Sequence, residues 1–339
     1  MRSHLNEARE MMAEIEKAWA RGVGAALAEV VAVTGSAYRR PGALMMMAAD
    51  GAMHGTVSGG CLEGDIFLRS EALMARGGAE LIDYDLDEDD MWSLGLGCKG
   101  RIKVWVRALR PDSPETALIR RALPAGGVLV TTLPDGIPRG WTPADGAPKG
   151  PAKDLVEAVW NGAEPVFRDS LYVRAWRPPH RLIIAGAGHD AEPVARLARE
   201  ADFEVTVLDP RPAFNDERRF PGVTHWVMEP EALSLDEHPE AEGAFWVVMN
   251  HHKDRDRRTL EAVARLRPKW VGALGPRRRT EEIMAMLDPA FRERVHGPLG
   301  LDIGADTPFE VAVSIVAELM AESRNRSGGS LNRKESLHV

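Results

Sequence analysis

The chain has 339 residues, of which 44% are hydrophobic, and a formal net charge of -8. This length predicts about two domains, and the apolar content is sufficient for packed cores. The acidic balance argues against a nucleic-acid partner, although three consecutive arginines, 277–279, form a local exception. No apolar stretch approaches the roughly 18 residues that span a bilayer, and residues 1–10 are too charged for a secretory signal, so we expect a cytoplasmic protein without a membrane partner.

The N-terminal part of the chain has the pattern of an α/β domain with a hairpin-rich extension. Apolar spacing predicts a helix over 5–20, a helix that ends near 74, and strands over 26–33, 44–48, 53–57 and 102–106. The acidic stretch 83–90 predicts a solvated loop. Residues 108–179 are richer in Pro and Gly and favour short strands over 128–133 and 171–176.

A linker is predicted at Pro178-Pro179, because two prolines cannot continue a helix or a central strand. Beyond it, strands over 205–208, 225–228, 245–249 and 270–274 alternate with helical segments, and a closing helix is expected over 308–323. This alternation predicts a Rossmann-like, doubly wound parallel sheet. We therefore predict an N-terminal α/β domain over 1–178, a Rossmann-like domain over 179–323 and a disordered tail over 324–339.

A dinucleotide-type phosphate turn follows the apolar run 182–185. In the pattern G-x-G-x-x-A, Gly186 and Gly188 allow the backbone to approach a phosphate at the start of the next helix. His189 and Asp190 stand where dehydrogenases commonly have small or apolar residues. Because Asp190 is anionic, we expect it to point away from the ligand or to cap the helix, and the ligand to differ from a plain nicotinamide dinucleotide.

Asp209 lies at the end of the second strand of this domain, about 20 residues after Gly188, where an acidic side chain accepts a hydrogen bond from a ribose hydroxyl. Arg211 is an alternative group for a phosphorylated ribose. The other interpretation of these residues is a simple turn.

Further polar groups follow the later strands and are expected at the same crevice. His251 follows the fourth strand, and Gly275, Arg277 and Arg278 follow the fifth. The two arginines suit a phosphate or form a solvated basic face. His251 and its neighbour have the wrong spacing to bind one metal ion from a regular element, which favours a hydrogen-bonding role.

Both cysteines of the chain, Cys61 and Cys98, lie in glycine-rich turns. The turn Ser58-Gly59-Gly60-Cys61 precedes a predicted helix, so its thiol is a candidate nucleophile, persulfide carrier or soft-metal ligand, as is Cys98. The alternative for each is a small buried residue, although a disulfide is disfavoured in a reducing compartment. Arg39 and Arg40 lie in another glycine-bounded turn and are candidates for binding an anion.

Six motifs occur in this chain in the order known from one family. They are residues 35–43, 58–65, 186–191, 248–251, 272–279 and 300–305. Through them the chain resembles the XdhC/CoxI family of xanthine dehydrogenase accessory proteins over nearly all of residues 1–322. The resemblance implies a dimeric cytoplasmic chaperone that binds the molybdenum cofactor and supports its sulfuration by a cysteine desulfurase. It also implies delivery of the cofactor to a xanthine dehydrogenase-like or CO dehydrogenase-like molybdenum hydroxylase.

We therefore expect a non-catalytic chaperone that holds molybdopterin, or its dinucleotide form, by its phosphate at residues 186–191 and by its metal end near Cys61. An NAD(P)-dependent oxidoreductase is the competing hypothesis, because the glycine turn and Asp209 also suit that cofactor. A nucleotide-sensing or scaffold protein is a third.

Overall fold

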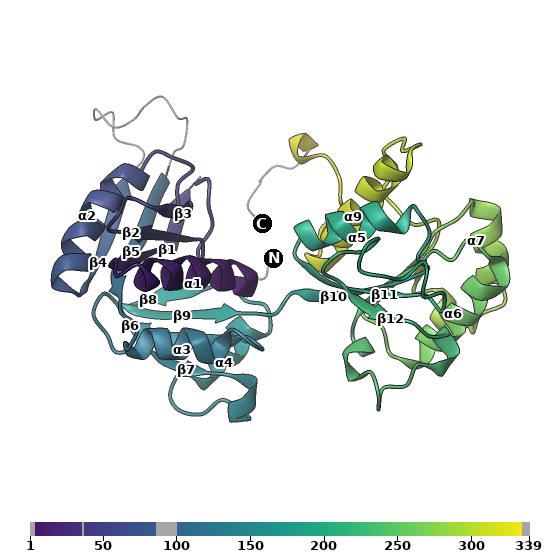
Figure 1. The fold of residues 1–339 in the computed structure, drawn as a ribbon, viewed down its shortest axis with the longest axis horizontal. Helices are drawn as coiled ribbons and strands as arrows, with labels where there is room; N and C mark the ends of the chain where they lie inside the picture. Colours follow the sequence, from purple (N-terminus) through teal and green to yellow (C-terminus); the bar gives the residue numbers. More distant parts are fainter. Residues whose placement is uncertain (1–3, 36, 86–99, 334–339) are drawn as a thin grey trace. The chain divides into compact units, whose positions relative to one another are not determined.

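The computed structural model describes residues 4–35, 37–85 and 100–333, and the chain divides into two compact units at the bond between Pro178 and Pro179 (Figure 1). The predicted fold class is confirmed, with antiparallel sheets in the first unit and a parallel sheet in the second. Within the described ranges, none of the helices combines the length and apolar character needed to cross a bilayer.

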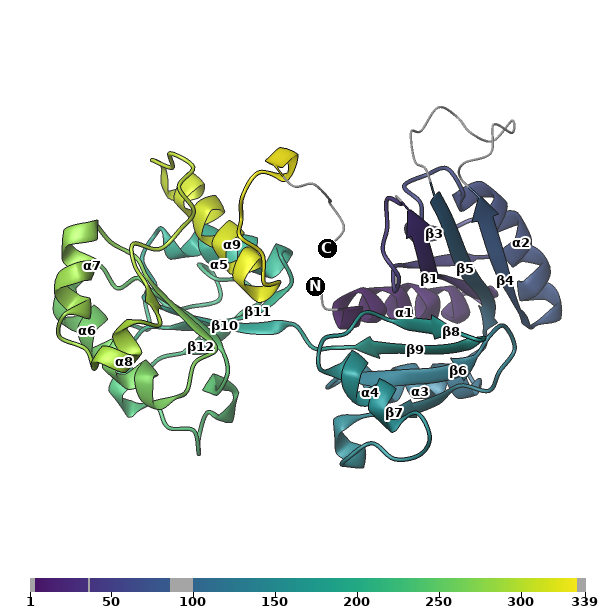
Figure 2. The same ribbon diagram turned by 180° about the vertical axis from the view of Figure 1, so that it is seen from behind.

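The first unit begins with a five-stranded antiparallel sheet in the order β3-β2-β1-β5-β4. Its strands are β1 Ala25–Gly35, β2 Leu44–Ala48, β3 Met53–Gly55, β4 Ala79–Asp85 and β5 Gly100–Leu109. Helix α1 (His4–Ala20) and helix α2 (Glu63–Arg76) cover its two faces (Figure 2). β1 is buried on both sides as a central strand, since Leu27 packs with α1 and Ala28 packs with α2.

One expectation for this sheet is wrong. The acidic side chains from residue 83 predict a solvated loop, but Asp83 and Asp85 belong to β4 and pair with β5. The opposite strand supplies a cation for each, because Lys103 pairs with Asp83 and the Arg101 guanidinium lies 2.7 Å from Asp85. Cross-strand charge pairing makes an acidic strand stable. Residues 86–90 lie outside the described part of the chain.

A second antiparallel sheet, in the order β7-β6-β9-β8, forms the extension of the first unit. Its strands are β6 Gly127–Thr132, β7 Arg139–Trp141, β8 Val166–Arg168 and β9 Leu171–Trp176; the 3-10 helix η1 spans Pro143–Asp145. Helix α4 (Lys153–Trp160) packs on one face, and on the other face this sheet shares a hydrophobic core with α1, helix α3 (Pro114–Ala122) and the first sheet. The two sheets are therefore parts of one folded unit.

A buried ionic network crosses this shared core. The Glu29 carboxylate accepts hydrogen bonds from the Tyr172 hydroxyl at 2.6 Å and from the guanidinium groups of Arg174 and Arg107 at 2.7 and 3.0 Å. Arg107 also donates to Glu115 at 2.6 Å. All five side chains are buried, and their contacts join β1, β5, α3 and β9.

The second unit contains a six-stranded parallel sheet in the order β12-β11-β10-β13-β14-β15, which is the strand order of the Rossmann fold. The strands are β10 His180–Ala185, β11 Phe203–Leu208, β12 Thr224–Trp226, β13 Phe245–Val248, β14 Trp270–Ala273 and the two-residue β15 Val295–His296. The first five agree with the predicted strands to within two residues, whereas β15 was not predicted because two residues carry no periodicity.

Helices cover both faces of the parallel sheet (Figure 1). Helices α5 (Ala191–Glu200) and α9 (Pro308–Ser323) pack on one face, and α6 (Lys253–Arg265) and α7 (Arg277–Met284) pack on the other. Shorter elements are α8 Pro289–Arg292 and the 3-10 helices η2 Pro230–Ala232, η3 Pro239–Ala241 and η4 Leu331–Arg333. η4 lies within residues 324–333, the described part of the predicted tail, whose disorder stays a prediction.

Candidate functional site

The strand order of the parallel sheet reverses between β10 and β13, and ligands of such sheets bind outside the carboxyl ends of the strands at this point. The Gly186–Ala191 turn leaves β10 here, and His251 follows β13. The His251 Nε2 atom lies 2.6 Å from Asp190 Oδ2, so this pair bridges the two strand ends. His251 has a positive φ of 58°, a conformation that costs energy for a side chain with a Cβ atom. The structure therefore places the Gly186–Ala191 turn and His251 at the same edge of the sheet, and it adds a contact between Asp190 and His251 that was not predicted.

The packing of the protein itself requires a glycine at position 186 of the Gly186–Ala191 turn. Gly186 has a φ of +114°, and a Cβ atom on it would lie 2.6 Å from the Met249 carbonyl oxygen. A Cβ atom on Gly188 would lie 2.7 Å from Asp190 Oδ1. Within the described residues, the amides of Gly188, His189 and Asp190 have no hydrogen-bond acceptor. These amides precede helix α5 and are the donors that an anion requires.

The predicted ribose acceptor, Asp209, is buried beneath this turn. Its carboxylate accepts hydrogen bonds from the Ala187 amide at 2.9 Å and from the Arg211 guanidinium at 2.7 and 2.9 Å. Burial alone would raise the pKa of Asp209, but these hydrogen bonds outweigh it and hold the pKa below its usual value. Asp209 thus supports the turn from below, and a ribose hydroxyl would have to compete with Arg211 for it.

Two ionic contacts surround the start of α5. Arg219 donates to Glu192 at 2.5 Å and to the Ala187 carbonyl at 2.9 Å, so it ties the first turn of the helix to the Gly186–Ala191 turn. The His189 side chain is 92% exposed, with Nδ1 3.5 Å from Glu192. Glu192 is therefore neutralised by Arg219, and the Asp190 side chain is held by His251, so neither carboxylate occupies the free amides.

The predicted basic pair after β14 points to solvent. The side chains of Arg277 and Arg278 are 78% and 92% exposed and pair only weakly with the glutamates one turn later in α7. Exposed pairs of this kind contribute little to stability, so both arginines are available to a ligand. Arg279 behaves differently: it donates to the Leu274 carbonyl at 2.8 Å, and a Cβ atom on Gly275 would lie 2.6 Å from its guanidinium.

A buried carboxylate beside His251 was missed at the sequence level. Asp256 accepts hydrogen bonds from the amide and the side chain of Asn250 at 3.0 and 3.1 Å, and its other oxygen lies 3.4 Å from Arg279. Burial raises the pKa of Asp256 and exceeds the opposing effect of these contacts. Asp256 and Arg279 fix the loop that presents His251. No sequence signal marks them, because both contacts come from the tertiary fold.

In the first unit, the Ser58–Cys61 loop is organised by one carboxylate, Glu63. Glu63 accepts hydrogen bonds from the amides of Ser58 and Gly60, each at 2.9 Å, from the amides of Val57 and Leu62, each at 3.1 Å, and from two hydroxyl groups. Burial acts to raise the pKa of Glu63, but the hydrogen bonds from the Ser58 and Thr56 side chains and from the backbone lower it to about 2. The carboxylate occupies the place that an external anion would take.

Cys61 is presented by this fixed loop. Its thiol is half-buried, and Sγ lies 3.9 Å from the Ser58 carbonyl oxygen. Gly59 has a φ of +85°, and a Cβ atom on it would lie 2.9 Å from the Tyr38 ring. The turn that contains Arg39 and Arg40 is therefore in contact with the loop, although the Arg39 guanidinium itself pairs with Glu7 of α1 at 2.6 Å. Sequence reasoning singled out Cys61 but missed Glu63, whose signal is a carboxylate at the first helical position after a glycine turn.

The metal-ligand hypothesis for the cysteines stays a prediction. Among the residues described by the structure, no three His, Cys, Asp or Glu side chains are grouped closely enough to hold a metal ion. Cys98 lies outside the described residues.

Comparison with known proteins agrees with this fold and these motifs. The model of the XdhC Rossmann domain matches residues 182–319, and the model of the XdhC and CoxI family matches residues 18–85. A Bacillus subtilis protein, named as a probable subunit of xanthine dehydrogenase, is 31% identical over 318 residues, which are 89% of this chain and 94% of that protein. The chain belongs to the XdhC and CoxI family.

Two further relatives of this family are informative. The molybdenum cofactor insertion chaperone PaoD of Escherichia coli is 26% identical, over 88% of this chain and 83% of its own. A crystal structure of a Bacillus halodurans protein described as a xanthine dehydrogenase has a TM-score of 0.76 and 25% identity, and the match covers 97% of this chain and 98% of that one. The family likeness thus extends over both units.

Proposed function

We propose that this protein is a maturation factor that holds the molybdenum cofactor and delivers it to a molybdenum hydroxylase of the xanthine dehydrogenase type. The likeness to PaoD, a molybdenum cofactor insertion chaperone, over 88% of this chain carries the proposal. Family membership and the Bacillus subtilis relative, whose name associates it with xanthine dehydrogenase, support it independently.

The residues of the Gly186–Ala191 turn fit the phosphate of such a cofactor. Three amides without acceptors in the described chain precede α5, and His251 lies on the loop after the neighbouring strand β13. Arg277 and Arg278 are the first residues of α7, which follows β14. We assign the phosphate to this turn and to His251, with the two exposed arginines as long-range positive charge. The turn's role is to bind and orient the cofactor.

The Ser58–Cys61 loop fits a different part of the cofactor. Bound molybdenum and its sulfur ligands supply oxo- and sulfur-transfer chemistry, and soft metal centres prefer thiolates to oxygen donors. Cys61 is a thiol held on a fixed loop, whereas the loop amides are occupied by Glu63. We therefore assign Cys61 to the metal end of the cofactor, and we assign Ser58, Gly59 and Gly60 to the backbone that presents this thiol to the cofactor.

The finer parts of the function belong to the same proposal. We infer a homodimer in the cytoplasm that supports sulfuration of the cofactor by a cysteine desulfurase, as the family resemblance implies. Co-purification with a tagged cysteine desulfurase tests this partner. The molar mass in solution, measured by light scattering, tests the homodimer. A strictly monomeric chain or the absence of desulfurase binding contradicts the respective part without affecting cofactor binding.

The decisive experiment is anaerobic purification from a host that makes the cofactor. We expect the wild-type protein to retain molybdenum, measured by mass spectrometry, and a pterin, measured by fluorescence after oxidation, in comparable molar amounts. Cys61→Ala should lose most of the molybdenum, and Cys98→Ala, which removes the other thiol, is the matched comparison.

Each outcome has a clear meaning. Wild-type protein without pterin contradicts the proposed function. Undiminished molybdenum in Cys61→Ala contradicts the assignment of the metal end to this thiol but leaves the function in place. Transfer of the cofactor to an apo-hydroxylase, followed as a gain of its activity, tests the delivery step.

A second candidate function is favoured by the Rossmann strand order and by Asp209 at the end of β11. These features also suit an NAD(P)-dependent oxidoreductase. The Arg211 contacts on both oxygens of Asp209 weaken this alternative, because they use the acceptors that a ribose needs. Tight binding of NADH or NADPH, seen by quenching of its fluorescence, together with oxidation of the nucleotide by a small carbonyl compound, would favour it over the chaperone.

A further inference from the structure

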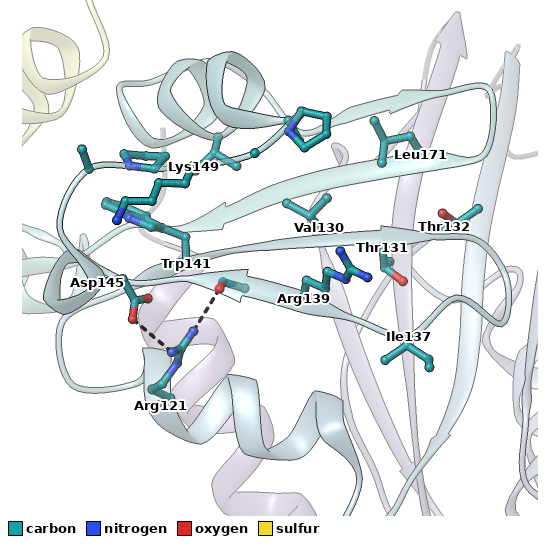
Figure 3. A pocket seen from close by; sticks show the side chains of 17 residues that line it. Arg121, Val130, Thr131, Thr132, Ile137, Arg139, Trp141, Asp145, Lys149 and Leu171 are labelled. Atoms are coloured by element: carbon teal, nitrogen blue, oxygen red, sulfur yellow. Dashed lines mark hydrogen bonds and ion pairs between the residues drawn. The ribbon is translucent and has the colours of Figure 1, made fainter.

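A pocket of about 750 Å³ opens on the second sheet of the first unit, beside β6, β7 and the segment that leads into α4 (Figure 3). This volume lies in the range of roughly 300–1,000 Å³ that is typical of small-molecule sites. The residues that line it fall between 121 and 171, outside both segments that the family models match. The pocket therefore differs from the two clusters assigned to the cofactor.

One side of the pocket is apolar and aromatic. Val130 of β6 and Leu171 of β9 form its floor, and Trp141 of β7 lies beside them (Figure 3). The indole N–H of Trp141 donates to the Gly146 carbonyl at 2.7 Å, and its ring meets Trp160 edge to face at 5.2 Å. The Trp141 ring is therefore held in place as a wall for a flat apolar group.

The rim of the pocket is positively charged. Arg139 and Lys149 are exposed, and within the described residues neither has an ion-pair or hydrogen-bond partner. The remaining charged groups of the lining, Arg121 and Asp145, neutralise each other at 3.2 Å (Figure 3). The pocket thus has a net positive charge in a chain whose formal net charge is -8.

The start of α4 also borders the pocket. Residues 150–152 line the pocket directly before the helix, and Ala152 at its N-cap supplies no side-chain acceptor. Asp154 in the first turn of α4 already places a negative charge at this helix end, so the positive potential of the pocket comes from Arg139 and Lys149. The two unpaired cations and the Trp141 ring together indicate a ligand that has a negative charge and a flat apolar part.

We propose that this pocket binds a small aromatic anion. Its flat ring system packs on Val130 and against Trp141, and its phosphate, sulfonate or carboxylate group pairs with Arg139 and Lys149. Binding involves no covalent step. The proposal goes beyond the proposed function, because it concerns other residues and does not depend on molybdenum.

Titration with 8-anilino-1-naphthalenesulfonate, followed by its fluorescence, tests this pocket in the full chain. We expect one site per chain, and an affinity that is about tenfold lower in Arg139→Ala/Lys149→Ala, as two exposed ion pairs predict. The matched control is Arg76→Ala/Arg265→Ala, which removes the same charge from exposed helical positions elsewhere and should bind like the wild type. N-phenyl-1-naphthylamine, the uncharged analogue, should bind both double variants alike.

Hydrogen exchange locates the site. The bound sulfonate should slow exchange in β6, in β7 and over residues 147–156, and flavin mononucleotide, an aromatic phosphate, should displace it. Equal affinity in the pocket variant and the wild type would overturn the proposal, as would protection elsewhere in the chain. Displacement by poly-glutamate together with failure of flavin mononucleotide to compete would also overturn it, because the pocket would then bind an acidic polypeptide.

Discussion

Glycine-rich loops precede α2 in the first unit and α5 in the second, and in each case a glutamate stands within the first two residues of the helix. In the Ser58–Cys61 loop this glutamate, Glu63, turns back and takes up the loop amides. In the Gly186–Ala191 turn, Glu192 pairs with Arg219 instead, and Asp190 pairs with His251. The first loop is thus satisfied internally and suits the display of a side chain, whereas the second keeps donors for a ligand.

The largest change in the free energy of unfolding is expected for a substitution at Gly186, because the Gly186–Ala191 turn packs directly against the backbone after β13. Gly186→Ala combines a positive φ with a contact of 2.6 Å to the Met249 carbonyl, so we expect a loss of about 3 kcal/mol in the free energy of unfolding. Gly243→Ala is the matched control, because its φ is +67° but its Cβ would meet nothing within 4 Å. Urea unfolding of both variants separates the contact from the φ strain, and equal losses would contradict the packing argument.

A somewhat smaller loss of stability is expected when the Glu63 carboxylate is removed from the Ser58–Cys61 loop. Glu63→Gln removes a charged acceptor of four amides, so we expect the free energy of unfolding to fall by roughly 2 kcal/mol. The rate at which a thiol reagent modifies Cys61 should rise as the loop loosens. Glu71→Gln, an exposed change on the same helix, should alter neither quantity. An unchanged Cys61 rate in Glu63→Gln would show that the loop keeps its conformation without the carboxylate.

The low pKa of Glu63 gives the same contact a pH signature. Because folding lowers this pKa from 4.5 to about 2, its contribution to stability is complete above about pH 4.5 and is lost as the pH falls toward 2. The urea midpoint of the wild type should therefore fall more steeply over this interval than that of Glu63→Gln. Parallel pH profiles of the two proteins would contradict an ionised Glu63 in the folded loop.

The smallest effects are expected on the affinity of the Gly186–Ala191 turn for an anion. Asp190→Asn removes a negative charge next to the free amides, so the affinity for pyrophosphate, measured by calorimetry, should rise about threefold. His251→Ala should lower it by a similar factor, while His252→Ala, a neighbouring exposed histidine, should leave it unchanged. Identical affinities in all three variants would remove the Gly186–Ala191 turn as the anion site.

Local pattern was sufficient to predict much of the second unit. Strands β10, β11, β13 and β14 are short, mostly apolar and buried runs, and the glycine pattern at 186–191 marks the turn between β10 and α5. The fold rule for such sheets places the loop after β13 at the same edge as the turn after β10, but the contact between His251 and Asp190 was not predicted. β15 escaped prediction because a two-residue edge strand is defined by its neighbour alone.

The supporting residues of both loops were not predicted, and only Glu63, at the first helical position after a glycine turn, has a local sequence signal. Glu63, Arg219 and Asp256 are ordinary charged residues of surface-like helices or loops until the fold directs backbone amides or carbonyls toward them. The β4 aspartates were misjudged for the same reason, since the compensating cations Arg101 and Lys103 stand on another strand. A charged residue in the sequence therefore does not by itself indicate a solvent-exposed loop, because the fold can supply a partner of opposite charge.

The buried network around Glu29 limits how this protein can be cut or can evolve. Glu29 belongs to the segment 18–85 that matches the family model, but its partners Arg107, Tyr172 and Arg174 lie far beyond that segment. In a fragment that ends at residue 85, the Glu29 carboxylate would have no partners. Breaking a buried ion pair in this way lowers the free energy of unfolding by about 3–5 kcal/mol. The matched segment is therefore not an expressible piece, and an exchange of modules between relatives has to carry residues 3–178 as one block. Substitutions at Glu29, Arg107 and Arg174 are expected to survive only in compensating combinations.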